Sequence, residues 1–250
     1  MACCHRSKNN KITKEKQTMI EPQPLITALG GGDQLESAMN RDQIAVFVKK
    51  RVVPIIGKVN YDMYRRTFSI ISELLLQGAP DILVVIDSNG GDTGFGLDIY
   101  DLIKTYPGQT TGMVFRMAAS MGATILQACT KRLCAEHGEI MIHYITQNNV
   151  PYDVVEDLRS RSLKQVRASM KRTQRAIYGM LARHSGKSEK EIRAACRKTS
   201  YMLPPEAKKF GLIDGVIERT DMAKWFRPDV LDELKKGGGL DAKADVGTKN

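Results

Sequence analysis

The sequence predicts an α/β fold with a parallel sheet, and three observations support this fold class. Short apolar runs of strand length alternate along the chain with longer amphipathic segments, which is the pattern of βαβ units. One of these runs, Ile82 to Ile86, is apolar throughout, as expected for a parallel strand buried on both faces. The chain has 250 residues, enough for one such domain with a sizeable core.

The first half of the domain is expected to alternate strands and helices. Apolar residues recur at helical spacing from Tyr61 to Gln77, and Gly78 follows as a helix stop. The expected apolar face of this helix comprises Tyr64, Phe68, Ile71 and Leu75. Strands are expected at Val52 to Ile56, Ile82 to Ile86 and Thr111 to Phe115, with a short buried helix at Met121 to Cys129.

The second half changes to a long charged helix at about residues 152–184, followed by a shorter one at 188–198. The long segment places Lys and Arg opposite an apolar stripe formed by Val155, Leu158, Leu163, Val166, Met170, Ile177 and Leu181. A helix of this length exceeds the core of one domain, so we expect its stripe to be buried against another subunit. The alternative is a helical arm that packs on its own sheet.

Composition divides the chain into three parts. Residues 1–43 are polar and basic and then rich in glycine, which favours a flexible arm or a removable leader. Residues 44–220 are expected to form the globular domain, and residues 221–250 a polar tail.

A candidate nucleophile lies where a strand gives way to a helix. Ser120 follows the apolar run that begins at Thr111 and precedes the expected short helix, whose first N–H groups have no intrahelical partner. The Met121 amide is therefore a candidate oxyanion donor, and a second donor could come from Gly90 or Gly91, which follow another expected strand. His143 is the candidate base, because the 23 residues that separate it from Ser120 leave room for one helix and one returning strand.

These residues occur in four segments whose order and spacing resemble the Clp protease proteolytic subunits. The segments are Ser88-Asn89-Gly90-Gly91, Arg116-Met117-Ala118-Ala119-Ser120-Met121-Gly122, Met141-Ile142-His143 and Pro205-Glu206-Ala207-Lys208-Lys209-Phe210-Gly211-Leu212-Ile213-Asp214. The resemblance covers roughly residues 46–218. It implies a crotonase-type fold of repeated ββα units, with the long helix as a protruding handle.

The resemblance also implies an activity and partners. The family consists of serine endopeptidases that hydrolyse peptides and unfolded proteins inside a closed chamber. For this chain it implies Ser120 as nucleophile, His143 as base, and the amides of Gly91 and Met121 as the oxyanion hole. It further implies a ring-forming homo-oligomer of two stacked heptamers. No cofactor is expected, since ATP would be used only by a partner AAA+ unfoldase.

Three positions depart from the family pattern. Asn89 replaces a proline, and Arg116 replaces a glycine at a place where its side chain would crowd or charge the cleft. Thr199 stands where the family has its third catalytic residue, an aspartate. A threonine can orient an imidazole but cannot stabilise imidazolium as a carboxylate does, so either the Ser and His pair is slow or another acid, such as Glu206 or Asp214, replaces it.

Other function classes remain open at this point. A catalytically impaired structural subunit would tolerate Arg116 and Thr199, and a prophage-encoded peptidase that processes capsid proteins would share the same motifs. An acyl-CoA enzyme of the crotonase type would use the glycine turn without a Ser and His pair. Signal-peptide peptidases on the same fold need a Ser and Lys pair, and the sequence has no Ser-x-x-Lys and no apparent anchor.

Composition bounds the remaining possibilities. The net charge of +10 is spread over the chain without a DNA-binding motif or an aromatic platform, so nucleic acid is not an expected partner. No apolar run approaches membrane-spanning length, and the start lacks a signal peptide, so a cytoplasmic location is expected. The five cysteines show no zinc-binding spacing. A metal cluster of His137, His143, Glu136 and Glu139 is not expected, because strand alternation would place them on different faces.

Overall fold

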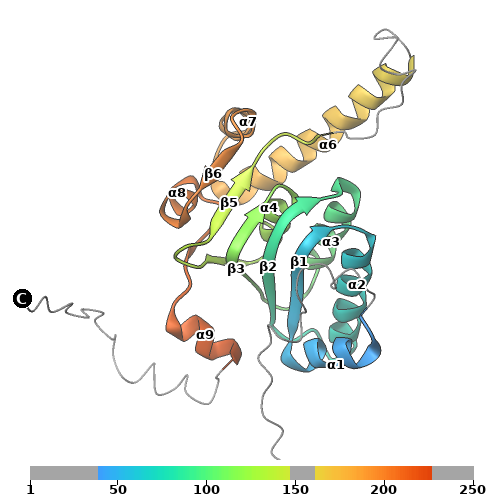
Figure 1. Cartoon of the computed structure of the whole chain (residues 1–250), viewed down its shortest axis with the longest axis vertical. Coiled ribbons are helices and arrows are strands. Elements are labelled where there is room, and N and C mark those ends of the chain that lie inside the picture. The colour runs from blue at the N-terminus through green and yellow to red at the C-terminus, as the bar shows by residue number, and fades with distance from the viewer. Residues whose placement is uncertain (1–38, 147–160, 227–250) are drawn as a thin grey trace, which may run out of the picture. The chain divides into compact units, whose positions relative to one another are not determined.

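The computed structural model describes residues 39–146 and 161–226, and it shows helices packed against a central sheet (Figure 1). This arrangement confirms the predicted α/β class. In the described part the strands are β1 (Val52–Val59), β2 (Ile82–Gly91), β3 (Thr110–Ala119), β4 (Lys131–Cys134), β5 (Glu139–Ile142), β6 (Ser200–Met202) and β7 (Gly215–Val216). The order of neighbours is β1-β2-β3-β4-β7, and β5 and β6 extend the sheet beside β3.

Strand β3 has two partners on the side away from β2. Its residues 111–114 pair with β4, whereas residues 117–119 pair with β5. All pairings are parallel except that of β5 with β6. Beyond β3 the sheet therefore divides into two arms, and Phe115 and Arg116 lie between them.

The described helices are α1 (Arg41–Lys50), α2 (Tyr61–Leu76), α3 (Thr93–Lys104), α4 (Met121–Leu126), α6 (Arg161–Ser185), α7 (Glu189–Arg197), α8 (Pro204–Phe210) and α9 (Arg219–Phe226). Side chains that favour helix starts explain several of these boundaries. Asn40, Asn60 and Asp92 each accept a hydrogen bond from the backbone N–H three residues later. Helices α2, α3 and α4 pack side by side against β1, β2 and β3 (Figure 1).

The expected apolar face of α2 was only partly right. The helix exists, and Ile71 is buried as expected. Phe68 and Leu75, however, lie on the exposed side, and the core instead receives a stripe formed by Met63, Thr67, Ile70, Ile71 and Leu74. Both stripes have helical spacing, so periodicity alone could not distinguish the face that packs on the sheet.

Several elements differ in extent from the sequence expectation. Strand β2 continues through the glycine pair to Gly91, and β3 continues to Ala119. Helix α4 is shorter than expected and ends at Leu126. Helix α3 was not assigned individually from the sequence, although Asp92 is a suitable N-cap for it.

Three of the boundaries expected from the sequence can be compared with the helices of the described part. Helix α1 begins at Arg41 and so includes the last three residues of the expected arm, and residues 1–38 lie outside the described part. Helix α6 matches the expected long helix from residue 161 onwards, and residues 152–160 lie outside the described part.

Residues 221–226 of the expected tail belong to α9, and residues 227–250 lie outside the described part. In α9 the Trp225 side chain is buried. The Arg51 guanidinium, at the start of β1, lies 5.8 Å from the centroid of the Trp225 ring. No helix in residues 39–146 and 161–226 is both long and apolar enough to cross a membrane.

Candidate active site

Ser120 occupies a sharp turn between β3 and α4. Its backbone has φ 56° and ψ −117°, a conformation that non-glycine residues rarely adopt. The Ser120 N–H donates to the Met141 carbonyl at 2.9 Å, which joins the turn to β5. Strain of this kind is found at functional sites where the surrounding structure enforces it.

The fold brings His143 to Ser120. His143 directly follows β5, which runs parallel to the last residues of β3. Its Nε2 lies 2.7 Å from Ser120 Oγ, a hydrogen-bonding distance. Both side chains are partly buried. The pair therefore has the geometry that a nucleophile and its base require.

Burial lowers the pKa of His143 below its usual range, because the charged imidazolium loses hydration. The imidazole is consequently neutral at pH 7 and its Nε2 is able to accept a proton. In the described part of the chain, the hydrogen bond that the structure records for this imidazole is the one to Ser120.

The end of β2 lies beside the nucleophile. A Cβ built on Gly90 would lie 2.6 Å from Ser120 Cβ and 3.0 Å from the Met121 nitrogen. Both distances are shorter than normal contacts, and Gly90 has φ 88°, so the position requires glycine. The two expected oxyanion segments are thus in direct contact.

The amide hydrogens of this segment have different environments. Gly90 N–H donates to Ser88 Oγ at 3.0 Å, and Ser88 Oγ donates to the Gly57 carbonyl at 2.6 Å. The Val59 carbonyl accepts from Asp92 N–H, which in a parallel ladder directs the Gly91 N–H away from β1 and towards the side of β3. Gly91 N–H is thus the better candidate for an oxyanion donor of the two glycines.

Ser88 contributes to the site, although the sequence analysis gave it no role. It is fully buried, and its hydroxyl links the Gly90 N–H to the Gly57 carbonyl of β1. The signal available in the sequence was a small polar residue that lies shortly after an apolar run and two positions before the glycine pair. Met121 is the first residue of α4, where an N–H group has no partner within the helix.

The antiparallel pairing of Ile142 with Ser200 brings Thr199 next to the register position of His143, but no hydrogen bond between the two side chains is recorded among the described residues. Thr199 is exposed between α7 and β6, and its φ of 51° is unusual for a β-branched residue. Its N–H donates to the Cys196 carbonyl at 3.2 Å. It lines a hollow with Lys198, Glu206 and Lys209, which is separate from the pocket that contains Ser120.

The two alternative acids have other partners. The Glu206 carboxylate accepts from the Leu203 N–H at 3.0 Å and so caps α8. The Asp214 carboxylate forms an ion pair with Arg132, which is itself almost fully buried, and accepts the Arg132 N–H at 2.7 Å. Neither carboxylate is recorded in contact with His143 among the described residues.

Arg132 links this late segment to the helix that follows the nucleophile. Its Nη1 donates to the Gln127 side-chain carbonyl at 2.6 Å and to the Gly211 carbonyl at 3.0 Å. The Gln127 amide donates in turn to the carbonyls of Ala123 and Leu212. This buried network ties the C-terminal end of α4 to residues 211–214, which gives the late sequence segment a structural role.

Arg116 does not leave an unpaired charge near the site. Its guanidinium contacts the Asp87 carboxylate at 2.7 Å and 3.2 Å, across β2 and β3. Asp87, which precedes the glycine turn, therefore offsets the positive charge that Arg116 was expected to bring to the cleft.

A small apolar pocket adjoins the Ser and His pair. Besides Ser120, Met121 and His143, its lining consists of Thr124, Ile142, Ile145, Ile177 and Leu181. The last two residues belong to α6, so the long helix forms one wall of the pocket. In residues 39–146 and 161–226, no group of three or more His, Cys, Asp or Glu residues is arranged to hold a metal ion.

Comparison with known proteins agrees with the geometry. The family model described as Clp protease matches residues 35–220. An ATP-dependent Clp protease proteolytic subunit from Ligilactobacillus salivarius (strain UCC118) is 30% identical over 183 residues, which cover 71% of this chain and 88% of the relative. The match includes the strand that ends in the glycine pair, the Ser120 turn and His143. The chain belongs to the Clp protease family.

Proposed function

We propose that the chain is a serine endopeptidase in which Ser120 is the nucleophile and His143 the general base. The observation that supports this most directly is the 2.7 Å distance between Ser120 Oγ and His143 Nε2 in a half-buried site. Family membership supports the same reaction class. The substrates would be peptides and unfolded proteins.

The proposed reaction has two halves. In the first, His143 Nε2 takes the Ser120 proton while Oγ bonds to the scissile carbonyl carbon, and the imidazolium then returns the proton to the leaving amine as the C–N bond breaks. In the second, His143 takes a proton from water as the water oxygen bonds to the ester carbon, and the imidazolium then returns the proton to Ser120 Oγ as the ester C–O bond breaks and the acid is released. The amides of Gly91 and Met121 would stabilise the oxyanion in both halves.

The adjoining pocket supports a preference for substrates with an apolar residue at the scissile bond. Its walls carry Ile142, Ile145, Ile177 and Leu181, and no Lys, Arg, Asp or Glu side chain is among its lining residues in the described part of the chain. Burying an apolar side chain there would contribute to binding roughly in proportion to the area removed from water.

We further propose that the chain works without a cofactor, as a ring-forming homo-oligomer of two stacked heptamers in the cytoplasm. The relative is named as ATP-dependent. By analogy, ATP would be used by an AAA+ unfoldase that delivers unfolded substrates.

A second candidate is a catalytically impaired subunit with a structural role. Thr199 favours it, because the position of the family's acid is exposed and lacks a carboxylate. Loss of the acid in a triad lowers turnover by up to about 10⁴ but leaves measurable catalysis. The two candidates therefore differ in rate rather than in fold.

Labelling with a fluorophosphonate probe tests the proposal. The purified protein, Ser120→Ala and His143→Ala would be treated in parallel, and mass spectrometry would locate the adduct. We expect an adduct on Ser120 in the parent protein and no labelling in either variant. Absence of labelling in a correctly assembled oligomer would instead favour the impaired subunit.

A further inference from the structure

The chain leaves the sheet at the end of β5, and His143 is the first residue beyond it. Strand β5 pairs with β3 as far as Met141 and with β6 as far as Ile142. Neither ladder includes residues 143–146, so strand pairing does not fix the backbone that carries the imidazole. Contacts with the neighbouring helices are therefore needed to keep His143 beside Ser120.

Gln174 of α6 provides one such contact. Its side-chain oxygen Oε1 accepts a hydrogen bond from the Ile145 N–H at 2.8 Å. Ile145 lies two residues after His143 and lines the apolar pocket. Ile177 and Leu181 follow Gln174 by one and two turns of α6, and they form the wall of the same pocket. The bond thus joins the segment that carries the imidazole to the helix that bounds the site.

The other end of the Gln174 amide has no comparable bond. Its Nε2 is buried and has no hydrogen-bond partner in the described part of the chain. Burying a donor in this way costs stability, because its hydration is lost and not replaced. An apolar side chain, such as Ile177 and Leu181 on the same stripe, would avoid this cost but could not accept from the Ile145 N–H. The bond to Ile145 thus accounts for an amide at position 174.

Tyr144 packs against α6 one turn beyond Gln174. Its ring centroid lies 6.4 Å from that of Tyr178, and the ring planes are tilted by 54°, an arrangement that aromatic pairs favour. Tyr178 is itself only 4% exposed, so the surrounding core fixes its position. Together with the Gln174 bond, this contact attaches the two residues that follow His143 to α6.

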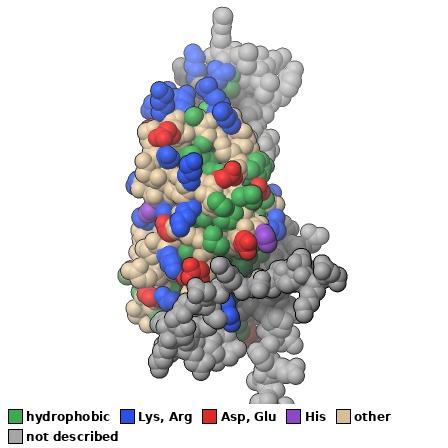
Figure 2. Space-filling model, turned by 90° about the vertical axis from the view of Figure 1, so that its left-hand side faces the viewer, with side chains coloured by type: hydrophobic (Ala, Val, Ile, Leu, Met, Phe, Trp, Pro, Cys, Tyr) green, Lys and Arg blue, Asp and Glu red, His purple; other side chains and the backbone are tan. Residues whose placement is uncertain are grey.

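Helix α7 holds the hydroxyl end of Tyr144. The Arg197 side chain, and with it that of Arg193 one turn earlier, hydrogen-bonds to the phenol and lowers the pKa of Tyr144 below its usual range. Both arginines are exposed. Figure 2 shows the side of the molecule on which α7 and α8 lie, with Lys and Arg side chains over much of it. Tyr144 is therefore held at its ring by α6 and at its hydroxyl by α7.

We propose that Gln174 and Tyr144 are positioning residues, which hold the segment that carries His143 between α6 and α7. In a complete triad, the acid fixes the orientation of the imidazole. No carboxylate is recorded beside His143 in the described part of the chain, so anchors on the next two residues would keep Nε2 within reach of Ser120. The inference rests on the proposed roles of Ser120 and His143 and adds the side chains that place them.

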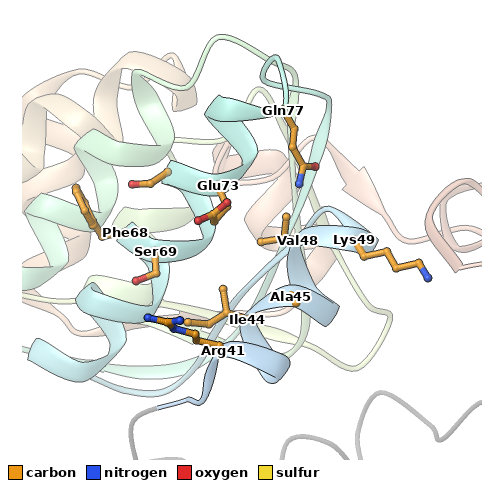
Figure 3. A pocket seen from close by; sticks show the side chains of 10 residues that line it. Arg41, Ile44, Ala45, Val48, Lys49, Phe68, Ser69, Glu73 and Gln77 are labelled. Carbon is orange, nitrogen blue, oxygen red and sulfur yellow. The ribbon is translucent and has the colours of Figure 1, made fainter.

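Substitutions that separate the hydrogen bond from packing test the proposal. Gln174→Leu removes the acceptor at nearly constant size, whereas Gln174→Glu keeps an oxygen for the Ile145 N–H. Tyr144→Phe removes the contact with α7 and keeps the ring. Gln77→Leu is the matched control, because the Gln77 side chain lies at the hollow between α1 and α2 (Figure 3), which shares no lining residue with the pocket beside Ser120.

Peptide hydrolysis by the full chain would give kcat and KM for each variant, and circular dichroism would establish folding. We expect Gln174→Leu to lower kcat by about 10 to 100-fold with KM changed less than about twofold, because displacing a catalytic group by about 1 Å has an effect of this size. Gln174→Glu should keep kcat within about threefold of the parent, and Tyr144→Phe should lower it by about two- to fivefold. Gln77→Leu should match the parent.

The pH dependence separates positioning from a general loss of structure. Burial lowers the pKa of His143, so an imidazole that leaves its site should regain a pKa nearer to 6.5, and the midpoint of the kcat profile should move upwards in Gln174→Leu. A kcat like the parent's in Gln174→Leu, or an equal loss in Gln174→Leu and Gln174→Glu, would overturn the proposal, because the acceptor would then have no role. If Gln174→Leu does not fold, Tyr144→Phe decides. A lower kcat at unchanged KM then supports the proposal, and the parent's kcat overturns it.

Diethyl pyrocarbonate, which modifies accessible imidazoles, distinguishes this proposal from the proposed function. Mass spectrometry would give the rate at which His143 is modified, and fluorophosphonate labelling would give the reactivity of Ser120. Faster modification in Gln174→Leu than in Gln77→Leu, without labelling of Ser120 in the parent, would support the positioning role and contradict the peptidase. Labelling of Ser120 in the parent, with equal modification rates in the two variants, would do the reverse.

Discussion

The two sides of the His143 imidazole differ sharply. On one side, Ser120 is held by a strained turn and lies within hydrogen-bonding distance of Nε2. On the other, the position that would carry an acid is an exposed threonine that lines a separate hollow. The fold of one chain thus places Ser120 and His143 together, and among the described residues no third side chain is recorded on the imidazole. A Ser and His pair can therefore have hydrogen-bonding geometry even where no acidic side chain is recorded beside the imidazole.

Removing the nucleophile should have the largest effect. Ser120→Ala should lower peptide hydrolysis by about 10⁵-fold or more, as for other serine nucleophiles that act in concert with a histidine. Ser169→Ala, on the exposed side of α6, is the control and should leave the rate unchanged. Hydrolysis of a fluorogenic peptide measures both. Substantial activity in Ser120→Ala would show that Ser120 is not the nucleophile.

Adding a methyl group at Gly90, next to Ser120, should have the next largest effect on the rate. In Gly90→Ala the new methyl group would overlap Ser120 Cβ, and the backbone φ of 88° adds strain. Displacing the oxyanion donors should lower the rate by about 10² to 10³. Gly179→Ala is a matched control, because nothing lies within 4 Å of a Cβ there and alanine favours the helix. Equal rates for the two variants would contradict the assigned geometry.

Supplying the missing acid should raise activity. Thr199→Asp is expected to increase the rate by about 10 to 100-fold, part of the factor of about 10⁴ that an acid contributes in a complete triad. The left-handed backbone at this position suits aspartate better than threonine. Thr199→Asn offers the same relief of strain without the charge. If Asn and Asp give the same rate, backbone relief and not a carboxylate explains any gain.

The pH dependence of peptide hydrolysis should reflect an imidazole that has Ser120 on one side and no carboxylate on the other. Burial lowers the pKa of His143, and the base must be neutral, so the rate should rise with pH to a plateau with a midpoint below 6.5. A carboxylate near the imidazole would favour the charged form and move the midpoint upwards in Thr199→Asp. Rates of peptide hydrolysis between pH 5 and 8 would measure the shift, in parallel with Thr199→Asn as the uncharged control. A downward shift in Thr199→Asp would show that the new carboxylate does not reach His143.

Replacing the two other acids should change the chemistry least. Glu206 caps α8 and Asp214 pairs with Arg132, so neither should act on His143. Glu206→Gln should change the rate less than twofold. Asp214→Asn should mainly lower stability, by about 2 kcal/mol, because buried Arg132 loses a charged partner. Thermal unfolding and peptide hydrolysis, measured together, separate the two effects. A large loss of activity in a stable Glu206→Gln protein would make Glu206 the third residue.

Much of the fold follows from local sequence signals. Ile82 to Ile86 is apolar throughout and forms the first half of β2, and the alternation around it predicts the α/β class correctly. The side of α2 that packs against the sheet could not be predicted, because Phe68 and Leu75 have the same helical spacing as the residues that are buried. Only the position of the sheet decides which stripe is covered.

The site was predictable to the extent that its residues lie in recognisable segments. Ser120, His143 and the glycine pair each occupy a segment of their own, and the parallel pairing of β3 with β5 explains why two of them meet. The roles of Ser88 and Asp214 depend on hydrogen bonds between residues 31 and 82 positions apart. No local pattern specifies partners at that distance, so these roles required the structure.

The contact between Arg51 and Trp225 determines how the domain should be delimited. The last described helix, α9, returns to the residue that directly precedes the first strand. A chain cut after Ile217 would remove α9 and expose the surface that it covers, although the seven strands of the described part would be retained.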